Sequence, residues 1–147
     1  MTLHLQKLCV GAESIEDLAA WQAGGGRAIA RAKGYDTPVH TTRMSPKRVA
    51  ELLDGGALYW IIKGQMRVRQ PLLDVRSVTR EGQSACDLVL APDLIPVVPR
   101  RVRPFQGWRY LRAEDAPADL TGLAEGQAAF EDFPADLRQE LAELALI

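Results

Sequence analysis

The sequence has few of the residues that bind metals or form disulfides. Only two cysteines and two histidines occur in 147 residues. Cys9 and Cys86 lie far apart, each in an apolar stretch, so we expect buried free thiols and no disulfide. His4 and His40 belong to no HxH or HExxH motif. We therefore expect neither a metal site nor a cofactor.

Long hydrophobic runs are also absent. The longest wholly apolar run covers residues 57–62, far short of the roughly 18 residues that a membrane span requires. The first residues, MTLHLQKLCVGAESIEDL, lack the basic segment followed by an apolar block that marks a signal peptide. We expect a cytoplasmic protein that does not contact membranes. The motifs GxSxG and GxGxxG are missing too, which argues against the common hydrolase and dinucleotide-binding classes.

The charges are distributed unevenly along the chain. Residues 27–112 hold 16 lysines and arginines against 7 acidic residues, whereas residues 113–147 hold one arginine against 9 acidic residues. The length fits one domain, so we expect residues 1–147 to fold together, with a basic core at about 35–112 and an acidic segment at 113–147. Such a local excess of positive charge favours an anionic partner. The alternative is that the two halves neutralise each other within the fold.

Helical patterns are few. Ser14 with Asp17 three residues later predicts a helix N-cap, and the three glycines at 24–26 end or break that helix. Ser45 and Pro46 predict the start of another helix, which the glycines at 55–56 close. The spacing of Leu137, Leu141 and Leu144 predicts a C-terminal helix.

Short strands dominate the remainder. Alternation or apolar character predicts strands at residues 3–10, 39–44, 57–62, 65–78, 86–90, 97–105 and 108–111. The strand at 57–62 is apolar on both faces and should be central, and Pro71 points to an edge or bulge. Closely spaced strands with few helices predict an α+β fold, a small mixed or antiparallel pseudo-barrel flanked by helices.

Three cations surround the predicted start of the second helix, namely Arg43, Lys47 and Arg48. A helix N-terminus already carries positive charge and usually attracts acidic residues. Cations at this position repel one another unless an anion binds, so they predict a phosphate site. The alternative is that Lys47 pairs with Glu51.

Alternating strands supply a second basic set. Arg67 and Arg69 share a strand face, as do Arg101 and Arg103, because strand side chains repeat every two residues. If the two strands are neighbours, their arginines form a ladder that favours phosphate. The alternative is a solvated outer face. Close by, Trp108 lies among arginines, where it could stack on an unpaired base or simply belong to the core.

The segment VHTTRMSPKRVAELLDGGALYWIIKGQMRVRQPLLDV, residues 39–75, resembles an uncharacterised bacterial family with a domain of unknown function, and the similarity extends through FQGWRYL. The arrangement of residues 39–112 also resembles the PUA-like superfamily, which includes the ASCH and EVE domains. That resemblance implies a small pseudo-barrel that binds RNA or modified nucleobases. Some ASCH members are amidohydrolases with a catalytic Lys and Thr after the helix-ending glycine, where this chain has Gly56 and Ala57.

We therefore expect a module that binds RNA, another nucleic acid or a modified nucleotide through its arginines and Trp108. One alternative is a small amidohydrolase acting on a modified nucleoside with Thr41 or Thr42, Lys63 and Glu51. Another is a protein-interaction module in which the acidic C-terminal segment docks on a basic surface.

Overall fold

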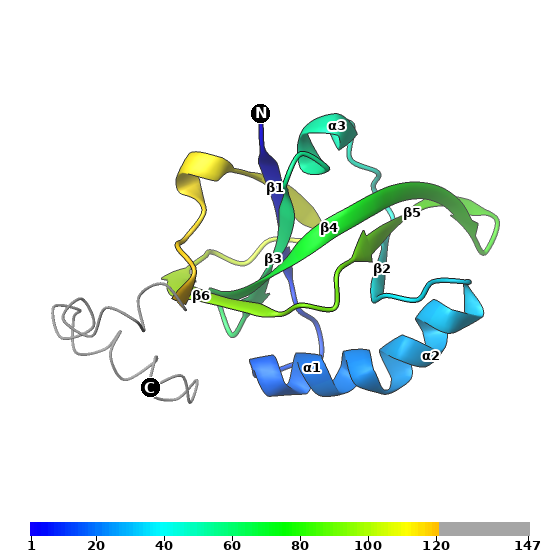
Figure 1. The fold of residues 1–147 in the computed structure, drawn as a ribbon, viewed down its shortest axis with the longest axis horizontal. Coiled ribbons are helices and arrows are strands. Elements are labelled where there is room, and N and C mark those ends of the chain that lie inside the picture. Colours follow the sequence, from blue (N-terminus) through cyan, green and yellow to red (C-terminus); the bar gives the residue numbers. More distant parts are fainter. Residues whose placement is uncertain (121–147) are drawn as a thin grey trace, which may run out of the picture.

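The computed structural model describes residues 1–120 as a mixed α+β fold (Figure 1). In this part of the chain one seven-stranded sheet is accompanied by three helices and a short 3-10 turn, η1. The elements are, in chain order, β1 Leu3–Leu8, α1 Ile15–Ala23, α2 Gly25–Ala32, β2 Val39–Thr42, α3 Val49–Leu52, β3 Ala57–Ile62, β4 Gln65–Arg80, β5 Gln83–Leu90, β6 Ile95–Arg101, β7 Trp108–Arg112 and η1 Ala113–Asp115. The predicted helix around Leu141 lies outside the described residues.

The predicted α+β fold is confirmed, but, unlike the predicted mixed or antiparallel pseudo-barrel, the sheet is not closed into a barrel. Its strands follow the order β2-β5-β4-β3-β1-β7, and β6 pairs with β4 off this path. All pairs are antiparallel except β1 with β3. The long strand β4 joins the two halves, because its first part pairs with β3 and β6 and its second part with β5.

Pro71 marks the position where β4 changes partner. It pairs with Ala57 at the end of the β3 ladder, and the register against β5 shifts between Leu72 and Asp74. Proline cannot donate a backbone hydrogen bond, which suits a strand that is leaving one neighbour for another. The predicted bulge is therefore confirmed within three residues of Pro71.

The strand β3 forms the centre of the molecule, as its sequence predicts. All six residues are buried, and alternate side chains enter two separate cores. Leu58, Trp60 and Ile62 belong to the larger core beneath α1, whereas Tyr59 and Ile61 belong to the smaller core on the other face. Burial of an apolar side chain contributes about 1.5–3 kcal/mol, so this strand contributes much of the stability of the fold.

A buried amide ties α1 to the sheet. Gln70 on β4 is completely buried, and its side chain exchanges two hydrogen bonds of 2.8 Å with Gln22 of α1. Its oxygen also accepts a bond from Trp60 Nε1, and its nitrogen donates to the carbonyl of Ala91. Since buried polar groups need partners, this network fixes the position of α1 over the larger core.

The break between α1 and α2 follows the glycine prediction. Ser14 caps α1 by accepting a bond from the Asp17 amide, and Gly24 separates the two helices. A Cβ on Gly25 would come within 2.7 Å of the Trp21 ring. The glycines therefore let this indole lie against bare backbone, a contact that larger residues would prevent.

The helix predicted from Ser45 begins later. Helix α3 has only four residues, starts at Val49 and has Arg48 at its N-cap position. The amides of Lys47 and Arg48 instead donate to the hydroxyl of Tyr110, at 2.9 and 3.2 Å, which holds them outside the helix. These cations therefore precede a single helical turn and not the start of a longer helix, and their binding of phosphate stays a prediction.

Candidate functional site

A basic groove lies over β6, β7 and the turn η1. It is an open hollow of about 620 Å³, and four arginines line it: Arg100, Arg101, Arg103 and Arg112. They come from two strands that are not hydrogen-bonded to each other, β6 and β7, and from the residues that follow β6. The groove therefore gathers positive charge from separate segments, and it includes the predicted residues Arg101 and Arg103, although Arg103 lies beyond the end of β6.

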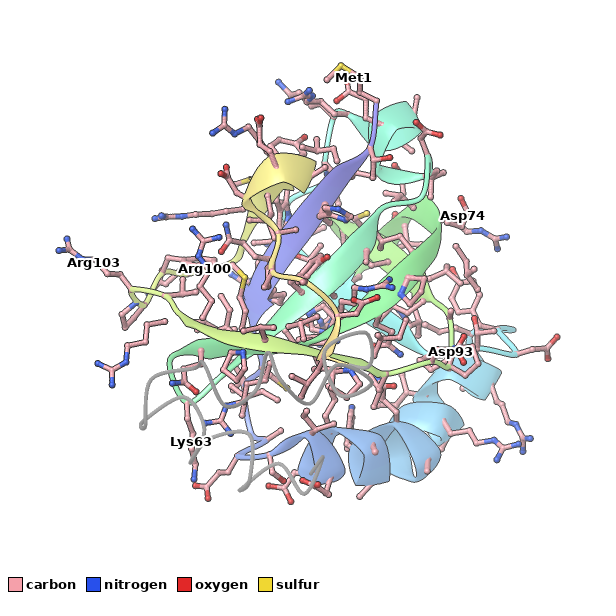
Figure 2. All side chains as sticks on the ribbon, turned by 60° about the vertical axis from the view of Figure 1, so that its left-hand side comes forward. Met1, Lys63, Asp74, Asp93, Arg100 and Arg103 are labelled. Carbon is pink, nitrogen blue, oxygen red and sulfur yellow. The ribbon has the colours of Figure 1, made fainter. Side chains whose placement is uncertain are left out.

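The arginines of the basic groove are only partly neutralised. Arg112 pairs with Asp115 at 2.9 Å and with Glu114 at 3.3 Å, and Arg100 donates to the carbonyl of Asp115. Arg101 and Arg103 are exposed and have no ion pair within the described residues. In Figure 2 the side chain of Arg103 extends outward from the ribbon. Among residues 1–120, two guanidinium groups of the groove thus lack an acidic partner.

Tyr110 connects the groove to the other predicted cations. It lines the groove, accepts the amides of Lys47 and Arg48, and has the Arg48 guanidinium 5.7 Å from its ring centre. Trp108 meets Tyr110 edge to face at 4.9 Å and donates from Nε1 to the carbonyl of Met44 at 2.6 Å. Five of the eight predicted residues, Lys47, Arg48, Arg101, Arg103 and Trp108, therefore line the groove or contact Tyr110.

The structure separates the remaining predicted residues from this surface. Strands β4 and β6 do pair, but Arg69 lies opposite Ile95, so the arginines form no continuous ladder. The register against β3 also shifts around Arg67, which breaks the alternation. Arg67 donates to Gln65 at 3.2 Å, and Arg69 is held by both oxygens of Asp119 at 2.7 and 2.8 Å. Arg43 lines a different hollow.

A second polar cluster surrounds Asp87 of β5. Its carboxylate is 2% exposed and accepts from Thr41 Oγ1 at 2.6 Å, Lys33 Nζ at 2.9 Å and the Tyr35 hydroxyl at 2.9 Å. Lys33 also donates to Thr41 at 2.8 Å. Burial alone would raise the pKa of Asp87, but the bonds from Thr41, Lys33 and Tyr35 outweigh it and hold the pKa below its usual value. The cluster therefore contains a charged carboxylate at neutral pH.

The Asp87 cluster lines a cavity of about 660 Å³ between α2, β2 and the ends of β4 and β5. We call this the Asp87 cavity. Its walls include Trp21 and Ile29 from the helices and His40 from β2. Sequence analysis missed Lys33, Tyr35 and Asp87. The sequence does contain one indication of this cluster, because Asp87 is the one charged residue in the apolar run 85–91. A charge that is buried with such a strand requires polar partners.

The alternative catalytic set chosen from the sequence is not assembled. Lys63 is exposed in the turn after β3 (Figure 2), and Glu51 pairs with Arg48. Thr42 is buried. Thr41, the other threonine considered, contacts Lys33 and Asp87 instead. Around Thr41 a threonine, a lysine and a carboxylate are thus in contact, but the lysine is Lys33 and the carboxylate is Asp87.

Residues 1–120 contain neither a metal-binding group nor a membrane-spanning helix. Within residues 1–120, no three His, Cys, Asp or Glu side chains are grouped so that they could hold a metal ion. Cys86 is buried and Cys9 partly buried, both as free thiols, and burial raises the pKa of Cys9 to about 11. None of the helices described is long and apolar enough to cross a membrane.

His40 makes the stability of this region depend on pH. Burial, together with the charges of Lys7 and Arg80, lowers its pKa from 6.5 to about 4. Its Nε2 is buried without a hydrogen-bond partner among the described residues. Between these two pKa values the unfolded chain binds a proton that the folded chain does not, so acidification favours unfolding.

We expect the free energy of unfolding to fall by about 2 kcal/mol between pH 7 and pH 5 through His40 alone. Urea unfolding of the native protein and of His40→Phe, which keeps a ring against Trp60, measures this contribution. His4, whose pKa is also lowered by burial, titrates in both proteins and cancels in the comparison. An equal pH dependence in both proteins would contradict the assignment to His40.

Comparison with known proteins identifies the family. A family model described as "Protein of unknown function (DUF1489)" matches residues 5–147. No curated protein and no solved structure matches the chain. The chain therefore belongs to the DUF1489 family, which confirms the predicted resemblance to an uncharacterised family. The resemblance to the PUA-like superfamily stays a prediction.

Proposed function

We propose that this member of the DUF1489 family binds nucleic acid, with single-stranded RNA as the preferred form, through the basic groove. The observation that carries the proposal is the convergence of Arg100, Arg101, Arg103 and Arg112 on one open hollow. Guanidinium groups bind phosphate oxygens through two parallel hydrogen bonds. A groove with several such groups, two of them unpaired within the described part of the chain, favours a ligand with regularly spaced phosphates.

The aromatic side chains beside the groove favour an unpaired strand. The ring of Tyr110 lines the hollow and Trp108 lies against it. Bases of a single strand can stack on such rings, whereas the bases of a duplex are inaccessible. The indole nitrogen of Trp108 is bonded to Met44 and Trp108 is half-buried, so we assign the base contact to Tyr110 and a supporting role to Trp108.

The salt dependence of RNA binding tests this proposal. Fluorescence anisotropy of a fluorescein-labelled 12-nucleotide oligouridine would be measured with the full chain at several salt concentrations. If the four arginines each neutralise one phosphate, the logarithm of affinity should fall with the logarithm of salt concentration at a slope of about −3. Absence of binding at low salt, or an affinity that does not change with salt, would contradict the proposal.

A second candidate function, a hydrolase acting on a modified nucleoside, is favoured by the contacts of Thr41. Its hydroxyl lies 2.8 Å from Lys33 Nζ and 2.6 Å from Asp87 Oδ1. A hydroxyl beside a base that is itself held by a third group is the arrangement of a nucleophilic catalyst. Thr41 would attack the acyl carbon, and Asp87, which accepts the hydroxyl hydrogen of Thr41, would take the proton and pass it to the departing amine. The ammonium of Lys33 would orient the Thr41 oxygen, and water would then release the acyl group from Thr41.

We expect Thr41→Val to abolish release of cytidine and acetate from N4-acetylcytidine, while Thr41→Ser retains part of the activity. Liquid chromatography of the reaction over several hours provides the measurement. Thr42→Val, one residue along the same strand, is the matched control and should change the rate little. Equal product formation by Thr41→Val and the native protein would remove this candidate.

A further inference from the structure

Two hollows that share residues lie beside the edge strand β2. The Asp87 cavity and a smaller hollow of about 130 Å³ are both lined by Thr41 and Arg80. The smaller hollow is also lined by Arg43. Together they extend from the helices α1 and α2 at one end to the turn between β4 and β5 at the other. One end of the joined hollows is aromatic and apolar, and the other end carries cations and hydroxyl groups. A ligand that fits both ends needs a flat ring and an anionic group.

The helical end presents an aromatic wall. Trp21 is 55% exposed and Ile29 is 49% exposed, and both line the Asp87 cavity. Trp21 lies against the bare backbone of Gly25 and Gly26, where added Cβ atoms would come within 3.0 Å of it. An indole held in this way keeps a large apolar surface in water, which is unfavourable unless a ligand covers it. A flat ring is the complementary shape.

The other end presents cations and hydroxyl groups. Arg80 and Arg43 are exposed and, within the described residues, have no ion pair. The acidic side chain that lines this end is Glu81, and Ser84 and Thr42 add hydroxyl groups. Lys33 lies between the two ends and uses its ammonium for Asp87 and Thr41. Two guanidinium groups with hydroxyl donors form a site for one phosphate.

From these two ends we infer that the joined hollows bind a free nucleotide, with its base on Trp21 and its phosphate between Arg80 and Arg43. The site is separate from the basic groove, because the two share no lining residue. The inference does not require RNA binding by the groove. It does not require Thr41 to act as a nucleophile either, although a nucleotide placed here would lie beside Thr41.

Isothermal titration calorimetry with adenosine 5′-monophosphate, adenosine and ribose 5-phosphate tests the inference. Both fragments should bind at least about tenfold more weakly than the nucleotide, because each occupies one end only. Trp21→Leu should weaken binding of the nucleotide and of adenosine by about tenfold. Arg43→Gln with Arg80→Gln should weaken the nucleotide by a factor of about 10–100 and leave adenosine unchanged.

Arg31→Gln is the matched control, since Arg31 lies on α2 and lines a different cavity, and it should bind the nucleotide like the native protein. Circular dichroism of each variant verifies the fold, and all the changed side chains are exposed. The inference is overturned if the nucleotide does not bind at millimolar concentration or if the Trp21 and arginine variants bind it normally. It is also overturned if binding is lost instead in Arg101→Gln with Arg103→Gln, which would place the ligand in the basic groove.

Discussion

Asp87→Ala is expected to lower the free energy of unfolding by about 3 kcal/mol at pH 7. The substitution removes a carboxylate that is 2% exposed and accepts hydrogen bonds from three side chains. Lys33, Tyr35 and Thr41 would lose their shared acceptor, and these contacts join the end of α2 and the loop after it to β2 and β5. Urea unfolding monitored by circular dichroism measures the loss.

Two further variants distinguish the loss of the ion pair between Lys33 and Asp87 from the loss of packing. Lys33→Met leaves the carboxylate buried without its cation, and the double variant Lys33→Met with Asp87→Ala removes both charges. Because removing both partners of a buried pair costs less than the two single losses together, the double variant should be more stable than additivity predicts. Additive losses would show that Lys33 and Asp87 do not interact in solution.

The contribution of Asp87 to the free energy of unfolding should depend on pH. The pKa of Asp87 in the folded chain lies below its usual value, so its contribution to stability is complete at neutral pH. That contribution disappears as the pH falls below about 4, where the unfolded chain binds a proton first. The difference in stability between Asp87→Ala and the native protein should therefore narrow as the pH falls from about 4 through the lowered pKa of Asp87.

The second large effect concerns the basic groove. Simultaneous replacement of Arg100, Arg101 and Arg103 by glutamine is expected to reduce the affinity for oligouridine about 100-fold at 0.1 M salt. The salt slope should fall from about −3 to about −1, since only Arg112 remains. Fluorescence anisotropy with the labelled 12-nucleotide strand measures both quantities. Because glutamine keeps much of the length of the arginine side chain, the loss of affinity would reflect the loss of positive charge.

A variant with the same change in net charge at other positions is the control for this experiment. Arg27→Gln, Arg31→Gln and Arg76→Gln remove three exposed cations that do not line the groove. This control should lower the affinity by less than about threefold, because charges beyond a Debye length are screened. Equal losses in both triple variants would show that RNA responds to overall charge and not to the groove.

Local patterns predicted the strands well but not their assembly. The run 57–62 has apolar residues at every position, so its burial in two cores follows from the sequence alone. The late start of α3 could not be predicted, because the hydroxyl that holds the amides of Lys47 and Arg48 belongs to Tyr110, more than 60 residues away. The open sheet depends on which strands pair, and strand pairing is not encoded in any single segment.

In the candidate sites, too, local patterns predict single strands, whereas the contacts between distant segments do not follow from them. Alternation along one strand predicts a shared face for Arg101 and Arg103, but β6 ends at Arg101, and Arg100 lines the groove with both of them. Arg69 was counted as available for phosphate, yet Asp119 binds it through a contact 50 residues apart in sequence. The Asp87 cluster was missed because its four side chains come from a helix end, a loop and two strands. Lone polar residues inside apolar strands are the signal that would have indicated it.

Mapping of backbone amide chemical shifts while oligouridine is added tests the central claim most directly. Binding in the basic groove predicts that the largest shifts occur at residues 100–103 and 108–112, with smaller shifts at Lys47 and Arg48. Shifts confined to other surfaces, or a spectrum that oligouridine leaves unchanged at low salt, would contradict the assignment of this groove to nucleic acid.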